Sequence, residues 1–168
     1  MPKIIENLES RLIAEARRQI EESGYSAMTI RSVAAGCGVG VGTVYNYFAS
    51  KEDLLATYML SDWMQCVCTI QKVSADSDAP QSVLRSIYDQ LLAYASRHQA
   101  IFQDENAIAA FCGSFSRYHG LLRRQLSQPL RKFWENAFVP DFVAESLLTW
   151  TMSGKSYDEI YYVIEKLL

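Results

Sequence analysis

The segment from Thr29 to Leu55 constrains the fold more than any other part of the chain, because it contains two short helical patterns separated by a glycine. In the first pattern, three small or apolar residues share one helical face, namely Ile30, Val33 and Ala34. Gly38 follows where the chain must reverse, a position that favours a left-handed backbone. In the second pattern, Val44 and Phe48 lie four residues apart on one face. The segment therefore predicts a helix-turn-helix.

Capping residues mark the ends of these helices. The hydroxyl of Thr29 is suited to cap the first helix of the pair. Ser50 and Asp53 resemble a capping box that opens a third helix, so the second helix is expected to end near Phe48 or Ala49. The face of that second helix opposite Val44 is expected to be exposed and to read base edges, and it carries Val41, Gly42, Tyr45 and Asn46.

The segment resembles the tetracycline-repressor (TetR) family of bacterial one-component regulators. Ten of its residues fall in register with the family's signature, and they are Gly38, Val39, Gly42, Thr43, Tyr45, Phe48, Ser50, Lys51, Glu52 and Leu54. A preceding helix from about Lys3 to Ser23, closed by Gly24, also suits this family. The motif resemblance covers about the first 55 residues, and beyond them it is only architectural.

This resemblance implies an all-α chain with a helix-turn-helix DNA-binding domain over residues 1–50. A helical domain for effector binding and dimerisation is then expected over residues 51–168. The implied function is ligand-responsive transcriptional regulation, as a repressor that binds a palindromic operator as a homodimer. An unknown small-molecule effector would release it from the double-stranded DNA. The expected location is the cytoplasm.

The family's DNA contacts can be transferred residue by residue. The expected DNA-binding residues are Thr29, Arg31, Val41, Gly42, Thr43, Tyr45, Asn46, Tyr47 and Lys51. Of these, Thr43, Tyr47 and Lys51 match phosphate contacts, and Arg31 matches a base or phosphate contact. Gly40 departs from the family pattern, because it replaces a serine that would cap the recognition helix. A purely structural alternative remains, in which Tyr45, Tyr47 and Phe48 form an aromatic core stripe.

The charge of the amino-terminal region is low for a DNA-binding domain. Residues 1–53 hold six Lys or Arg side chains against seven Asp or Glu side chains, and the whole chain carries a net charge of −3. A strongly basic surface usually supplies most of the affinity for DNA. Affinity must therefore come from a few placed contacts, which a dimer would double.

The remainder of the chain also predicts helices, since no strand-like alternation persists. One helix is expected from Ser50 to about Val73, a polar loop over residues 74–79, and a second helix from Pro80 to about Arg97. Residues 98–112 suggest a short helix with a break. A long helix should follow to about Asn136, kinked at Pro129, which lacks a backbone N–H.

The carboxy-terminal region predicts two helices with apolar stripes. Pro140 should open the first, and a capping box formed by Ser156 and Glu159 should open the second, which runs to Leu168. By resemblance, these helices pair with their symmetry mates. The expected dimer residues are Phe142, Val143, Leu147, Trp150, Tyr157, Ile160, Tyr161, Ile164 and Leu168. The alternative is that both stripes serve only the core of a single chain.

The middle of the chain is rich in aromatic residues, which could line an effector pocket. The candidate ligand-binding residues are Trp63, Tyr88, Phe102, Phe111, Phe115, Tyr118 and Trp134. Aromatic residues at helical spacing also commonly form a solid core, so both interpretations stay open. The sequence does not identify the ligand.

Other functional classes receive little support from the sequence. No hydrolase, metalloprotease or phosphate-loop pattern is present, so no enzyme activity, cofactor or metal is expected. The four cysteines lack Cys-x-x-Cys spacing, no apolar run could span a bilayer, and the start has no signal-peptide pattern. An alternative is a helical protein-interaction adaptor or small-molecule binder that does not bind DNA.

Overall fold

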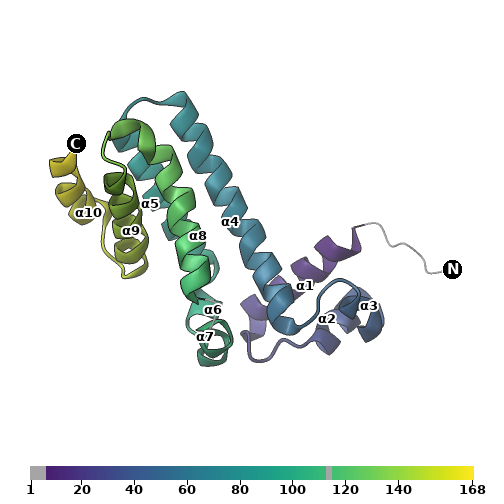
Figure 1. Ribbon diagram of the computed structural model, residues 1–168. Helices are drawn as coiled ribbons and strands as arrows, with labels where there is room; N and C mark the ends of the chain where they lie inside the picture. Colours follow the sequence, from purple (N-terminus) through teal and green to yellow (C-terminus); the bar gives the residue numbers. More distant parts are fainter. Residues whose placement is uncertain (1–6, 113–114) are drawn as a thin grey trace. The chain divides into compact units, whose positions relative to one another are not determined.

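The computed structural model describes residues 7–112 and 115–168, and within them every regular element is a helix (Figure 1). The all-α prediction is therefore confirmed. The chain divides into two compact units. The first unit comprises residues 1–61 and 98–113, and the second comprises residues 62–97 and 114–168. Helix α4 (Lys51–Asp76) belongs to the first unit in its first part and to the second unit thereafter.

The first unit contains the helix-turn-helix and a segment distant in sequence. Its helices are α1 (Leu8–Ser23), α2 (Ile30–Cys37), α3 (Val41–Tyr45), the start of α4, α6 (Gln99–Phe102) and α7 (Glu105–Cys112). One apolar core joins them, because each contributes buried residues spaced for a single face. These include Leu12, Ile20, Val33, Val44, Phe48, Leu54, Tyr58, Ile101 and Ala107.

The turn of the helix-turn-helix forms as the sequence predicts. Thr29 accepts a hydrogen bond from the Ser32 backbone nitrogen (3.0 Å), and the Ser32 hydroxyl oxygen accepts one from the Thr29 nitrogen, so a capping box opens α2. Gly38 has φ 69° and ψ 33°, the left-handed conformation expected at the reversal. Ser50 Oγ accepts a bond from the Asp53 nitrogen at the start of α4, which confirms half of that predicted box.

Two helices of this unit are shorter than predicted. In the described residues α1 begins at Leu8, and the part of its expected range before residue 7 lies outside them. Helix α3 ends at Tyr45 rather than near residues 48 or 49. The backbone nitrogens of Tyr47 and Phe48 both donate to the Val44 oxygen at 3.0 Å, so the chain turns out of the helix there. Gly40, at the N-cap, supplies no side-chain bond to extend the helix at its start.

The second unit consists of the later part of α4 and six further elements. These are α5 (Pro80–Arg97), α8 (Phe115–Ser127), the 3-10 helix η1 (Gln128–Phe133), α9 (Phe138–Met152), α10 (Tyr157–Ile164) and the 3-10 helix η2 (Glu165–Leu167). Helix α9 packs against both α5 and α8 (Figure 1). The Ser156–Glu159 capping box opens α10 as predicted, and Gly154 takes φ 83° before it.

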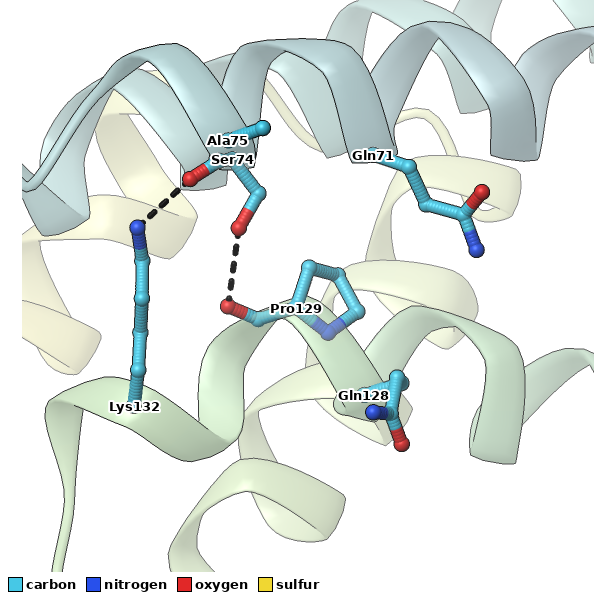
Figure 2. A pocket seen from close by; sticks show the side chains of 6 residues that line it. All are labelled: Gln71, Ser74, Ala75, Gln128, Pro129 and Lys132. Atoms are coloured by element: carbon cyan, nitrogen blue, oxygen red, sulfur yellow. Dashed lines mark hydrogen bonds between the residues drawn. The ribbon is translucent and has the colours of Figure 1, made fainter.

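The chain departs from the predicted helix ends around Pro129. Helix α4 continues through Asp76, beyond its predicted end near Val73. Lys132 Nζ donates to the backbone oxygen of Ser74 in its last turn (2.5 Å) and to that of Ser77 just after it (2.7 Å). Figure 2 shows Lys132 reaching Ser74, and the Ser74 hydroxyl donating to the Pro129 oxygen. Pro129 does not kink a long helix but stands near the start of η1, where its missing N–H is tolerated.

The compact units do not follow the predicted division at residue 50. Residues 98–113 join the first unit, because Ile101 and Ala107 are buried in the core that also holds Leu12 and Phe48. The proposed functional division into residues 1–50 and 51–168 remains a prediction. No helix among the described residues is both long and apolar enough to cross a membrane.

The left-handed turn can be tested with two glycines that have equal space around them. A Cβ at Gly38 or at Gly42 would meet no atom within 4 Å, but only Gly38 has a positive φ. We expect Gly38→Ala to lower the free energy of unfolding by about 1 kcal/mol. The matched Gly42→Ala should raise it by up to about 1 kcal/mol, because alanine favours a helix. Urea unfolding that gives both variants the same sign would contradict this assignment.

Candidate DNA-binding surface

The recognition helix α3 and the turn that follows it present an exposed polar and aromatic surface. Tyr45 is 54% exposed and Tyr47 is 43% exposed, and Asn46 between them is exposed as well. Phe48 is 2% exposed and belongs to the core. The alternative of an aromatic core stripe is therefore wrong for both tyrosines and right for Phe48. Two phenol hydroxyls and one carboxamide are available on this surface to donate or accept hydrogen bonds.

The other predicted base readers differ in exposure. Gly42 is exposed and has open space beside it, so the backbone can approach another molecule closely there. Val41 is half-buried and packs against the core of the unit. Thr43 is also half-buried. Val41 therefore contributes to the fold as well as to the surface, because its place in the first turn of α3 lies beside the core.

Helix α2 contributes one cation to this surface. Arg31 is exposed and forms no ion pair within the described residues. Thr29, two residues before it, is exposed but uses its hydroxyl in the capping box of α2. Its role in the structure is to begin the helix that carries Arg31.

The predicted phosphate contact of Lys51 is engaged within its own unit. Its Nζ donates to the backbone oxygen of Tyr25 at 2.6 Å and lies 3.9 Å from the centroid of the Tyr25 ring. Burial lowers the pKa of the Lys51 ammonium, and the nearby Glu52 carboxylate acts in the opposite direction. Lys51 thus fixes the loop between α1 and α2 to the first turn of α4. A phosphate contact would require its side chain to leave this position or to be shared.

The basic residues of α1 are largely neutralised by acids on the same helix. Arg18 pairs with Glu15 (2.7 Å) and with Glu22 (2.5 Å), and Arg17 pairs with Glu21 (2.8 Å). Hydrogen bonds from Arg18 and Gln19 lower the pKa of Glu15 to about 2. The near-neutral charge of this region is therefore organised as local pairs. Arg31 on α2 is an exposed cation outside these pairs.

The predicted dimer residues separate into two groups. Five of them are buried within the chain and leave no surface for a second copy, namely Val143, Leu147, Tyr157, Ile160 and Ile164. Helix α10 uses this stripe to cover its own unit: the Tyr157 ring packs edge-on against Tyr88 (5.6 Å between centroids). Tyr161 is half-buried and stacks on Tyr157. The clearest apolar stripe therefore packs within its own unit, and the assignment of these residues to a dimer interface stays a prediction.

The remaining predicted dimer residues that the structure exposes are three, and two of them, Phe142 and Trp150, line a hollow between α9 and α10. Phe142 (46%), Trp150 (50%) and Leu168 (53%) are exposed. The sequence did not single out five further exposed apolar residues. Phe138 and Met152 are on α9, Tyr162 and Val163 are on α10, and Leu167 is on η2. A hollow of about 380 Å³ between α9 and α10 is lined in part by Phe142, Trp150 and Val163. We call the exposed apolar surface formed by Phe138, Phe142, Trp150 and Val163 the α9–α10 face.

The predicted effector residues that the structure describes in the second unit have different packing partners, and their role in ligand binding stays a prediction. Trp63 is buried, donates from Nε1 to Gln125 Oε1 (2.6 Å) and packs edge-on against Tyr94. Tyr88 is buried against Tyr157, and Trp134 Nε1 donates to the backbone oxygen of Leu167. Tyr118 is exposed, and Phe102 is exposed in the first unit. The side chains of Phe111 and Phe115 lie outside the described part of the chain.

A second hollow occurs at the end of α4, on the surface drawn in Figure 2, and contains none of the predicted effector residues. Its volume is about 330 Å³, and its lining is Gln71, Ser74, Ala75, Gln128, Pro129 and Lys132. Lys132 is already bonded to the carbonyls beyond α4. Across the described residues, no three His, Cys, Asp or Glu side chains are grouped to hold a metal ion.

Comparisons with known proteins agree with this geometry. Residues 12–58 match the family described as bacterial regulatory proteins, tetR family. The transcriptional regulator BetI of Burkholderia thailandensis is 37% identical over 93 residues, which are 52% of this chain and 46% of BetI. HbdR of Aromatoleum sp., also a transcriptional regulator, is 35% identical over 54 residues, which are 32% of this chain and 24% of HbdR. The chain thus spans about half or less of the length of these relatives.

Solved structures resemble the fold over nearly the whole chain. The repressor AlkX from Dietzia sp., implicated in biodegradation of n-alkanes, has a TM-score of 0.67 at 15% identity, covering 94% of this chain and 93% of AlkX. At this identity the similarity concerns the fold alone.

The contacts of Lys51 predict a loss of stability when its charge is removed. Lys51→Met keeps the aliphatic stem but removes a charge-assisted hydrogen bond and a cation–π contact. We expect the free energy of unfolding to fall by about 1–2 kcal/mol. Lys72→Met, an exposed position later on α4, is the matched control and should change it by less than about 0.5 kcal/mol. Equal stability of the two variants in urea would show that Lys51 does not hold the loop.

Proposed function

We propose that the chain, whose residues 12–58 match the tetR family of bacterial regulatory proteins, is a ligand-responsive transcriptional regulator. It binds a palindromic operator in double-stranded DNA as a homodimer, acts as a repressor, and is released by a small-molecule effector. The observation that carries this proposal is the exposed surface of α3 and of the turn after it, where Tyr45, Asn46 and Tyr47 are exposed while Val44 and Phe48 are buried.

The contacts that we propose with DNA follow from chemistry and exposure. The Asn46 carboxamide can pair with a base edge in the major groove, as asparagine does with adenine. The Tyr45 and Tyr47 hydroxyls can donate to phosphate oxygens, and Arg31 can pair with a phosphate or a guanine. With Lys51 bonded internally, few charged contacts remain in each head. The affinity should therefore depend weakly on salt compared with strongly basic DNA-binding proteins.

A dimer supplies what one short recognition helix lacks. Helix α3 has five residues, so a single copy can read only a few base pairs. Two copies related by a two-fold axis read two half-sites, and each phosphate contact is made twice. We propose that the α9–α10 face holds the two copies together, because Phe138, Trp150 and Val163 expose apolar surface that needs cover.

The effector remains a proposal without an assigned pocket. A ligand can shift the protein only by binding the DNA-competent and incompetent conformations unequally. Repression and release are typical of regulators with this domain. We also propose that the protein acts in the cytoplasm, where bacterial DNA lies, and that it has no catalytic activity of its own. The relatives matched here are transcriptional regulators and not enzymes.

A second candidate is a helical adaptor or small-molecule binder that has no DNA activity. It is favoured by Gly40, which leaves α3 without a side-chain cap, and by the internal bonds of Lys51 and the arginines of α1. Gel-shift measurements with DNA from upstream of the protein's own gene separate the two. Retarded DNA at submicromolar protein supports the regulator, and none at any tested salt concentration supports the adaptor.

The exposed cation of α2 gives a quantitative test of the DNA contacts. If Arg31 contacts a phosphate in each copy, Arg31→Ala should reduce the slope of log affinity against log salt by about 1.8 per dimer. Arg85→Ala, an exposed arginine of the second unit, should leave the slope unchanged. Asn46→Ala should instead alter which half-site sequence is preferred, at a cost of about 1–3 kcal/mol on the wild-type sequence. An unchanged slope in Arg31→Ala would exclude the phosphate contact.

Two adjacent residues of α10 test the dimer. Val163 is 58% exposed and Ile164 is 2% exposed. A carboxylate at Val163 should leave each chain folded but disrupt the association, so Val163→Asp should sediment as a folded monomer. Ile164→Asp should unfold the second unit instead, because it buries an unpaired charge at a cost of several kcal/mol. A Val163→Asp protein that stays dimeric at micromolar concentration would place the interface elsewhere.

A further inference from the structure

The segment 98–112 is bonded to the loop that leads into the DNA-contact helices. In sequence this segment is flanked on both sides by residues of the second unit, yet it packs in the core of the first. Ile101 and Ala107, at 3% and 1% exposed, share that core with Tyr25 and Met28 of the loop between α1 and α2. The loop is therefore supported by residues about 80 positions later in the chain.

Asp104 makes the polar part of this contact. The Ser26 backbone nitrogen donates to Asp104 Oδ2 (3.1 Å), and the Ser26 hydroxyl lies 3.1 and 2.9 Å from the two carboxylate oxygens. Asn106 Nδ2 donates to the same Ser26 hydroxyl oxygen at 2.8 Å. The carboxylate also accepts the backbone nitrogens of Asn106 and Ala107 (2.9 and 3.1 Å) and so caps α7. One side chain thus opens α7 and holds Ser26.

The adjacent loop residue is held from the other side. Tyr25 is 3% exposed. Its backbone oxygen accepts the hydrogen bond from Lys51 Nζ, and its side-chain hydroxyl donates to Glu52 Oε1 (3.3 Å). Residues 25 and 26 are therefore fixed by the first turns of α4 and α7 together. Only two residues separate Ser26 from Thr29, the cap of α2, and Arg31 follows in the first turn of that helix. A shift of the loop between α1 and α2 would therefore change the positions of Arg31 and of helix α3.

We propose that Asp104 is a positioning residue of the DNA-contact surface, which holds the loop between α1 and α2 through Ser26 and so makes DNA affinity depend on segment 98–112. This inference rests on the proposed function. Asp104 does not touch DNA in this account. It acts through Ser26, and its loss allows the loop and the start of α2 to sample other positions. Binding the DNA then requires these positions to be restored, which weakens the affinity.

The test compares three variants of the full chain. Ser26→Ala removes the hydroxyl that contacts Asp104 and leaves the α7 cap in place. Asp104→Ala removes the carboxylate that both bonds Ser26 and caps α7. Glu105→Ala changes an exposed acid of the same turn and is the control. The probe is a duplex that the wild-type protein selects from a randomised pool. The readouts are affinity, its salt slope, and hydrogen exchange of the backbone amides of residues 25–34.

We expect Ser26→Ala and Asp104→Ala to weaken the affinity by about three- to tenfold, the size of one or two lost hydrogen bonds. The salt slope should stay at the wild-type value, since no phosphate contact is removed. Exchange at residues 25–34 should accelerate in both variants and stay unchanged in Glu105→Ala.

Several results would overturn the proposal. Wild-type exchange in both Ser26→Ala and Asp104→Ala would show that the contact does not hold the loop, whether or not the protein binds DNA. Faster exchange with unchanged affinity would show that the loop does not position the DNA contacts. An equal loss of affinity in Glu105→Ala would assign the effect to general destabilisation of α7. If the wild-type protein selects no duplex, the proposed function itself fails, while the exchange rates still decide whether Asp104 holds the loop.

Discussion

The rotation of α3 about its own axis determines which side chains of the helix-turn-helix are exposed. Burial of Val44 and Phe48 in the core of the first unit fixes that rotation, and the left-handed turn at Gly38 delivers the chain to it. Because residues of a short helix have few other contacts, these two side chains determine which groups face outward. Tyr45, Asn46 and Tyr47 are exposed for this reason, and any function of the surface follows from that placement.

Most of the charged side chains discussed for the first unit are paired with groups close to them in space. Arg17 and Arg18 of α1 are paired with acids one turn away, and Lys51 bonds the loop between α1 and α2. Such exposed pairs contribute little to stability individually, but they remove cations from the surface that could otherwise attract DNA without regard to sequence. A regulator built in this way gains specificity from a few positioned contacts and from dimerisation. This explains how a near-neutral head is compatible with the proposed role.

The parts of the structure that were predictable from sequence are those encoded within a few residues. The caps at Thr29 and Ser156 and the turn at Gly38 depend on neighbours three or four positions away, and all three formed as expected. What could not be predicted depends on distant partners. The end of helix α4 is bonded by Lys132, 58 residues beyond Ser74, and the loop at Ser26 is held by Asp104, 78 residues away. No local pattern carries such pairings.

The candidate dimer face shows the same limit in another form. Helix α9 is apolar on several sides, so its sequence did not reveal that Val143 and Leu147 pack inward while Phe138 and Trp150 face outward.

Hydroxyl-radical footprinting of the wild-type protein on DNA upstream of its gene tests directly whether two copies of the protein read DNA through α3. A dimer that reads two half-sites should give two protected patches of equal strength, centred about one helical turn or a multiple of it apart. A single patch, or uniform protection without a preferred position, would contradict a two-fold regulator that reads DNA through α3.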